Sequence, residues 1–277
     1  MKKLLILFSI CTMATAAYCQ DDAYYTGDEG SVTAKSQEAP PELPTYTQPP
    51  CPADGYIWIP GYWALGNDGY FWVAGVWVMP PGTDLLWTPG YWGFYGGYYG
   101  WHGGYWGGSV GYYGGVNYGF GYYGSGFYGG RWEGGHFRYN TAVWRVGNGV
   151  HNTYVSHDGV RNGGVHSSYN GPGGVKYRPA PHEQAAMHDN NHVAATKEHA
   201  AHEQSMGTER GQFHSNNARP ATHSMSTPGG QRFNERGHAV NMGGGAPRGG
   251  GAPHGGGGSQ HGGGGSPGGG HGGGGRH

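Results

Sequence analysis

Cysteine is nearly absent from this sequence, with three in 277 residues. Cys11 and Cys19 lie in or at the edge of an apolar N-terminal segment, which leaves Cys51 alone in the rest of the chain. A disulfide framework therefore cannot hold the fold together, and the lack of a Cys-x-x-Cys pair excludes a thiolate metal site. We expect Cys51 to be a bystander, with pairing between two chains as the alternative.

Positive charge is missing from a long stretch, because no Lys or Arg occurs between Lys35 and Arg131. Residues 20–130 carry nine acidic side chains and one basic one, and the remainder from residue 131 is mildly basic. Nucleic-acid binding requires Lys and Arg gathered on one face. We therefore predict no nucleic-acid partner.

Long hydrophobic runs are also lacking. The longest, residues 4–10, follows two lysines and precedes small residues, which is typical of a secretory signal over residues 1–19. A bilayer span needs about 18 apolar residues, so we predict export to the periplasm, outer membrane or cell surface, with no transmembrane span. Cleavage after Ala16, cleavage after Cys19 and lipid attachment at Cys19 are three alternatives for the end of this segment.

Catalytic signatures are absent as well. There is no G-x-S-x-G motif, no glycine-rich loop ends in GK[ST], and Asp84, Glu133 and Asp158 are scattered in turn-like contexts. We predict a protein that is not an enzyme and needs no cofactor.

The sequence does have tryptophan, in a repeated pattern. W-x-x-G-x-W occurs at residues 58–63, 72–77, 87–92 and 101–106, and uses eight of the ten tryptophans. The first tryptophans of successive units are 14, 15 and 14 residues apart, and the extra residue falls in the segment PPGTD at 80–84. Length variation confined to Gly, Pro and Asp indicates loops between constant units.

Within a unit, Ile, Val, Tyr, Trp and Phe predict β structure. One geometry is a two-residue turn at Pro60-Gly61. The favoured alternative is one strand per unit with a glycine bulge, and hairpins that turn at residues 66–69 and 80–84. Alternation then places one set of rings on a common ligand or packing face: Trp58, Trp63, Trp72, Trp77, Trp87, Trp92, Trp101, Trp106, Tyr56, Tyr70 and Tyr99.

These four units resemble the YXWGXW repeat family of bacterial exported proteins. Tyr56, Tyr70 and Tyr99 each precede a unit by two residues, and Leu85 stands there in the third copy. The stretches at 129–143 and 168–181 also resemble segments that follow the repeats in family members. The resemblance spans roughly residues 50–225 and implies compartment and architecture, without carrying over any functional residue.

The fold class predicted is mainly β, a small antiparallel sheet or meander of the repeats. After the signal, residues 20–50 are acidic and Pro-rich and predict a disordered linker. Residues 51–180 form the aromatic and glycine-rich β domain, with strands at 136–146 and 150–155 that extend the same sheet. Residues 181–242 are polar and His-rich with short helices, and residues 243–277 form a disordered Gly/His tail.

Histidines in the polar segment give one candidate metal site. His188, His192, His199 and His202 are spaced to share one face of a helix and could chelate Zn, Ni or Cu. Asn190 and Asn191 interrupt that helix, and a solvated polar linker is the favoured interpretation.

Three functions follow in order of preference. The first is a structural or interaction protein of the bacterial envelope, with self-association or another envelope component, protein or glycan, as its partner. The second is a glycan- or peptidoglycan-binding module that stacks sugars on the Trp and Tyr face. The third is metal binding through the histidines.

Overall fold

The fold is given by a computed structural model, which describes residues 24, 25, 27–160, 166–207 and 219–240. The predicted signal, the lipidation site Cys19 and the Gly/His tail lie outside the described residues. The described residues belong to one compact unit. No helix in the described part is long and apolar enough to cross a membrane.

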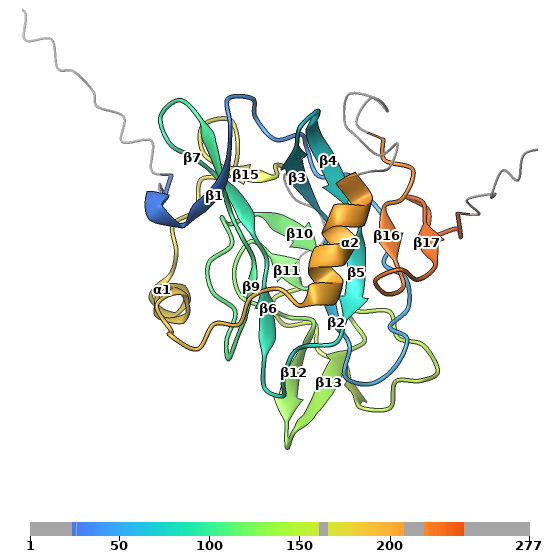
Figure 1. Cartoon of the computed structure of the whole chain (residues 1–277). Helices are drawn as coiled ribbons and strands as arrows, with labels where there is room; N and C mark the ends of the chain where they lie inside the picture. The colour runs from blue at the N-terminus through green and yellow to red at the C-terminus, as the bar shows by residue number, and fades with distance from the viewer. Residues whose placement is uncertain (1–23, 26, 161–165, 208–218, 241–277) are drawn as a thin grey trace, which may run out of the picture. The chain divides into compact units, whose positions relative to one another are not determined.

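The described part is mainly β, as predicted, and consists of short strands in several small sheets with two short helices (Figure 1). The elements in chain order are a 3₁₀ turn η1 (Glu29–Ser31), β1 (Val32–Ser36), β2 (Ile57–Ile59), β3 (Tyr62–Gly66), β4 (Gly69–Val73), β5 (Gly75–Val78), β6 (Leu86–Thr88), β7 (Tyr91–Phe94), β8 (Tyr99–His102), β9 (Tyr105–Gly107), β10 (Asn117–Gly119), β11 (Tyr122–Tyr123), β12 (Gly130–Glu133), β13 (His136–Asn140), β14 (Thr153–Tyr154), β15 (Tyr169–Asn170), α1 (Pro181–Met187), α2 (Lys197–Gly207), β16 (Ser224–Met225) and β17 (Arg232–Phe233).

Each W-x-x-G-x-W unit contributes two strands, and two consecutive units pair as one hairpin. In the first hairpin, residues 57–78, β2 pairs with β5 and β3 pairs with β4. In the second hairpin, residues 86–107, β6 pairs with β9 and β7 pairs with β8. The hairpin predicted at residues 66–69 is confirmed, since Gly66 pairs with Gly69.

Two details of the predicted repeat geometry are wrong. Residues 80–84 do not form a hairpin turn, because they join the two hairpins and β5 pairs with β2 instead of β6. The predicted glycine bulge is also wrong. Between the two paired stretches of the hairpin, each arm has two residues that do not pair with the other arm, so neither arm has the one extra residue that defines a bulge. Both arms break at the same level, so each hairpin contributes to two separate sheets.

The linker predicted over residues 20–50 is part of the fold where the structure describes it. β1 pairs with β8, and Leu43 and Gln48 are buried. Indole N–H groups of the first hairpin fix this segment: Trp63 donates to Glu42 O (3.0 Å) and Trp77 donates to Pro49 O (2.9 Å). Backbone carbonyls that satisfy buried indoles keep this Pro-rich stretch in place.

The strands predicted at 136–146 and 150–155 do not extend the sheets of the repeats, whereas β15 pairs with β7 and β16 pairs with β5. β12, β13 and β14 form a sheet of their own, in which β13 and β14 are parallel. The strand predicted at 136–146 ends at Asn140, whose side chain accepts from Ala142 N and Ser156 N and donates to Tyr128 O. Helix α2 begins where the Thr196 hydroxyl accepts from His199 N (3.2 Å), and packs against β4.

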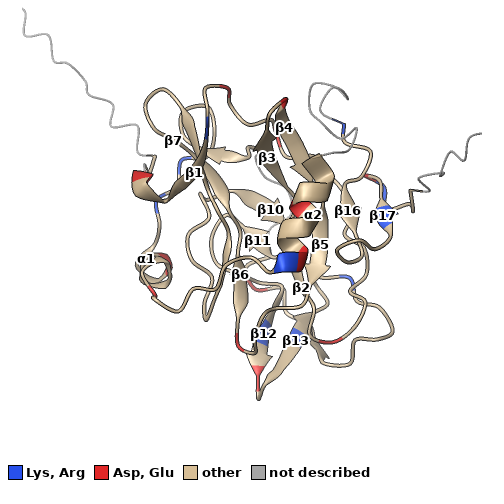
Figure 2. Ribbon diagram, in the orientation of Figure 1, with Lys and Arg blue, Asp and Glu red and all other residues tan. Residues whose placement is uncertain are grey.

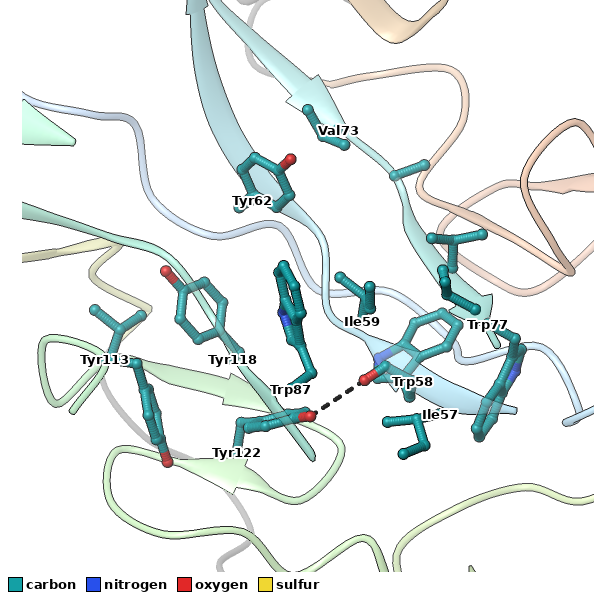
Figure 3. Packing of buried hydrophobic residues seen from close by; sticks show 14 of the residues in the cluster. Ile57, Trp58, Ile59, Tyr62, Val73, Trp77, Trp87, Tyr113, Tyr118 and Tyr122 are labelled. Atoms are coloured by element: carbon teal, nitrogen blue, oxygen red, sulfur yellow. Dashed lines mark hydrogen bonds between the residues drawn. The ribbon is translucent and has the colours of Figure 1, made fainter. Parts of the chain in front are cut away.

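The core consists mostly of rings from the repeats and from the glycine-rich stretch that follows them. Figure 3 shows Trp58, Trp77 and Trp87 packed with Ile57 and Ile59, and shows the hydroxyl of Tyr122 donating to Trp58 O (3.3 Å). Residues 109–130 are therefore packed against the same chain.

Candidate functional site

Tryptophans pair across the arms of each hairpin, between units and not within a unit. Each first tryptophan of one unit lies opposite the second tryptophan of its partner unit, at ring-centroid distances of 5.2–5.4 Å. The four pairs are Trp58 with Trp77, Trp63 with Trp72, Trp87 with Trp106 and Trp92 with Trp101. Edge-to-face or tilted ring pairs at this distance are favourable beyond their burial.

The glycine of each unit lies beneath the first tryptophan of the partner unit. A Cβ placed on Gly75 would lie 2.5 Å from Trp58 Cζ2, and one on Gly90 would lie 2.5 Å from Trp101 Cζ2. Gly61 would overlap the ring of Trp72 and Gly104 the ring of Trp87 in the same way. Glycine is required at these positions for close approach and not for backbone conformation, since none of the four has positive φ.

Most of the predicted aromatic face is buried. Seven of its eight tryptophans are at most 3% exposed, and Tyr70 is 2% exposed. Trp101, Tyr56 and Tyr99 are partly buried. The rings that were candidates to stack on a ligand therefore face one another and the segments that cover them.

Comparison with known proteins agrees with the geometry. A family model described as the WXXGXW repeat matches residues 54–78 with two copies. The chain carries WXXGXW repeats. The match covers the first hairpin, and the second hairpin repeats its tryptophan pairing and its glycine contacts. No curated protein and no solved structure matches the chain.

The four candidate metal ligands do not share a helix. His188 caps the end of α1, His192 lies in the following turn, and only His199 and His202 are on α2. The ring of His192 stacks on Tyr105 at 3.9 Å between centroids, and His202 Nε2 bonds to Ala74 O at 2.7 Å. No group of three or more His, Cys, Asp or Glu within the described residues could hold a metal ion.

Cys51 is a free, fully buried thiol. Burial raises the pKa of Cys51 to about 12, and its Sγ donates to Ala53 O at 3.3 Å. A thiol that is protonated and inaccessible is unreactive. The structure therefore favours the bystander over pairing between chains.

Buried His102 forms a hydrogen-bonded cluster with exposed Ser31 and half-buried Tyr95. Its Nδ1 lies 2.8 Å from Ser31 Oγ and its Nε2 lies 2.5 Å from the Tyr95 hydroxyl. Ser31 Oγ donates its proton to Asp28 O (2.8 Å), so the network assigns the His102 proton to Nδ1 and makes Nε2 the acceptor. In this arrangement His102 cannot take a proton from Ser31. The hydrogen bonds of the cluster connect η1 to the WXXGXW repeats.

A small pocket lies where the arms of the two hairpins break, and we call it the bend pocket. Its volume is about 110 Å³, and its floor is formed by Pro60 of the first hairpin and by Pro89, Gly90 and Gly104 of the second. Helix α2 closes it from the side. The side chains that surround the space are Tyr62, Trp87, Trp101, Tyr118, His199 and Glu203.

Polar groups in the bend pocket are few: Tyr62 and His199 are buried, and Glu203 is half-buried. The Tyr62 hydroxyl donates to Glu203 Oε2 at 2.7 Å, and burial raises the pKa of Tyr62 well above its usual value. Burial, reinforced by nearby His202, lowers the pKa of His199 to about 3, so its ring is neutral. Neither ring nitrogen of His199 has a hydrogen-bond partner among the described residues, although the side chain is only 3% exposed.

A larger and more open pocket lies beside the hairpin of β12 and β13, and we call it the tip pocket. Its volume is about 420 Å³. Trp132, Phe137 and Met79 contribute apolar lining, and polar side chains from β13 and from several loops complete it: Asp54, Thr83, His136 and Asn152. The Trp132 indole is held by donation to Leu85 O (2.9 Å).

Sequence reasoning missed most of the residues in these pockets. Glu203 follows His199 by four residues, a spacing that places both on one helix face and that could have been noticed. The sequence around Tyr118 gives no comparable signal. Its hydroxyl donates to Gly90 O (2.6 Å), which lies 28 residues earlier in the chain, and no local spacing indicates such a contact. Trp132 lies outside the WXXGXW repeats, and nothing in its neighbourhood of the sequence indicates a pocket.

Proposed function

We propose that this protein is a non-enzymatic structural or interaction protein of the bacterial envelope, built on its four WXXGXW repeats. The N-terminal residues support export, and the resemblance of the repeats to those of bacterial exported proteins supports the compartment. The observation that carries the proposal is the burial of seven of the eight repeat tryptophans. Rings that are already packed supply a rigid module and are not available to an external ligand.

The distribution of charge also supports a scaffold. The repeat strands contain no Asp, Glu, Lys or Arg, and Figure 2 shows the charged residues scattered over loops, helices and other strands. A module of this kind contacts its partner, a second copy or another envelope component, through the segments around the hairpins. Those segments carry the polar variety that recognition requires.

Tryptophan emission and acrylamide quenching test this proposal on the full chain without residues 1–19, alone and with isolated cell-wall glycan. We expect blue-shifted emission with a small quenchable fraction from Trp101 and Trp132, which are the two partly exposed indoles. Glycan should leave the buried fraction unchanged. Red-shifted emission that glycan protects would overturn the proposal in favour of a sugar-binding face.

Glycan binding remains the second candidate, but at a different place. The tip pocket offers a partly exposed indole beside acidic, amide, hydroxyl and imidazole side chains, a combination suited to a sugar's apolar face and its hydroxyls. Its volume of about 420 Å³ falls within the range of small-molecule sites.

Retention on cell-wall material separates the two candidates. Under the scaffold proposal, Trp132→Ala leaves any retention unchanged. Under the glycan alternative, Trp132→Ala abolishes retention while far-ultraviolet circular dichroism stays the same. Trp87→Ala is not a suitable probe, because Trp87 is 3% exposed and its loss would disturb the core.

A further inference from the structure

We propose that the bend pocket binds a small organic ammonium ion, alone or as the head group of a larger molecule. This inference goes beyond the scaffold function. It rests on four properties of the pocket: its size, its acceptors, its charge and its opening.

The size of the bend pocket selects a head group. A volume of about 110 Å³ corresponds to about three or four water molecules at roughly 30 Å³ each. It is well below the roughly 300 Å³ at which drug-sized sites begin, so a sugar ring or a peptide segment does not fit. A substituted ammonium group does.

Two side chains in the pocket, Glu203 and His199, can accept hydrogen bonds. The carboxylate of Glu203 uses one oxygen to accept from Tyr62, and an ionised carboxylate accepts several further hydrogen bonds. The neutral ring of His199 presents an acceptor nitrogen with no partner among the described residues. A buried polar side chain without a partner indicates an unrecorded water or a ligand, and here it lines a cavity.

Charge and aromatic lining both favour a cation. Glu203 is the only charged residue among those lining the pocket, and no Lys or Arg lines it. Rings from the hairpins and from β10 surround the same space, and Figure 3 shows Tyr62, Trp87 and Tyr118 grouped together. Aromatic rings around a desolvated cation are the usual means of recognising substituted ammonium groups.

The pocket opens to solvent at Gly103 and Ala195, which are both exposed lining residues. Gly103 has nothing within 4 Å of the position where a Cβ would lie, so the mouth is clear on that side. A head group can therefore enter while the rest of its molecule stays outside.

Titration of the full chain without residues 1–19 tests the proposal, with the ring signals of His199 followed by NMR. The probes are choline and its neutral isostere 3,3-dimethylbutan-1-ol, together with Nα-acetyl-lysine methylamide. Saturable shifts with choline alone indicate a quaternary head group, and saturable shifts with the lysine derivative alone indicate a peptide ammonium. Either result, or both together, supports the proposal. Equal binding of the neutral isostere overturns it, because the charge is then not recognised, and no saturable shift with either cation overturns it and leaves a water-filled pocket.

Matched variants locate the site. Glu203→Gln keeps an acceptor for Tyr62 and removes the charge, so we expect about tenfold weaker binding or more. Glu198→Gln alters an exposed carboxylate of the same helix and should leave binding unchanged. If Glu203→Gln lowers the melting temperature too far, Ala195→Trp serves instead, because it blocks the mouth from an exposed position.

Unchanged affinity in both Glu203→Gln and Ala195→Trp would also overturn the assignment. Failure here is distinguishable from failure of the scaffold proposal. The pocket titration does not depend on glycan, and the quenching experiment does not depend on ammonium ions.

Discussion

The two hairpins have the same pairing but different surroundings. In the first, three indole N–H groups bond to carbonyls of segments outside the hairpin, for example Trp72 to His223 O (3.1 Å). In the second, Trp92 donates to Trp63 O of the first hairpin (2.8 Å). Each hairpin also has one indole Nε1 with no partner among the described residues, that of Trp58 in the first and that of Trp106 in the second. The repeat therefore determines which rings meet, and the covering segments determine how deeply each pair is buried.

The difference is clearest at one pair of equivalent residues. Trp72 and Trp101 are both the first tryptophan of the second unit in their hairpins, and each covers a glycine of the partner unit. Trp72 is 2% exposed, whereas Trp101 is partly exposed and lines the bend pocket. Equivalent sequence positions thus serve as core in one hairpin and as the wall of a cavity in the other.

The largest expected effect comes from truncating these two residues. Trp72→Ala should lower the free energy of unfolding by about 4 kcal/mol, because a large buried ring leaves a cavity. Trp101→Ala should lower it by about half as much, because its ring is already partly in contact with solvent. Urea denaturation followed by circular dichroism gives both values, and equal losses would mean that the two hairpins are covered alike.

Acid should act on the cover of both hairpins through buried histidines, but on the strands themselves only in the second, because the first hairpin contains no histidine. Burial lowers the pKa of His102 to about 4 and that of His199 to about 3, from 6.5. Between the folded and the unfolded pKa of each histidine, the unfolded chain binds more protons than the folded chain. The contribution of these histidines to the free energy of unfolding is therefore complete above about pH 6.5 and is lost as the pH falls towards 3. At about pH 4.5 each histidine should remove about 2 kcal/mol.

Urea denaturation of the native chain, His102→Gln and His157→Gln at neutral pH and at about pH 4.5 measures this loss. His102→Gln should reduce the acid sensitivity, since the side chain that must stay neutral is gone. The matched change at exposed His157 should leave it as in the native chain. An acid loss that is the same in all three proteins would show that His102 is not its source.

The smallest effect distinguishes two neighbouring glycines of the fourth unit. Gly104→Ala would drive a methyl group into Trp87 and towards Thr88 O at 2.7 Å, and should cost about 2 kcal/mol through overpacking. Gly103→Ala meets nothing within 4 Å and should be neutral or slightly stabilising. Thermal denaturation separates the two, and similar melting temperatures would mean that the indole does not rest on the glycine.

The sequence was sufficient for the class of fold and for the units. Periodic tryptophans, β-forming residues and the turn at 66–69 predicted the first hairpin correctly. They could not predict that the pairing is interrupted at the same position on both arms. That interruption depends on an indole of one arm lying on a glycine of the other arm. They also could not assign residues 38–49 to the core, because Pro-rich composition does not reveal which carbonyls will accept from buried indoles.

The candidate site was predicted less well for the same reason. The repeat tryptophans pack against one another as a set, but the side on which they are covered depends on segments far away in the chain. The spacing of His188 and His192 does not fall within a helix, because α1 ends at Met187, whereas His199, His202 and Glu203 all lie on α2. The segments that cover the repeats come from distant parts of the chain, and their sequences show no periodic pattern that would indicate this role.

The reciprocal contact between glycine and tryptophan limits how repeat units can be gained or lost. A unit on its own has a glycine with no ring above it and a first tryptophan with no glycine to cover. Equivalent tryptophans of the two hairpins are 29 residues apart throughout, as in Trp58 and Trp87. The element that can be copied, deleted or exchanged between molecules is therefore the pair, and repeats of this kind should occur in even numbers.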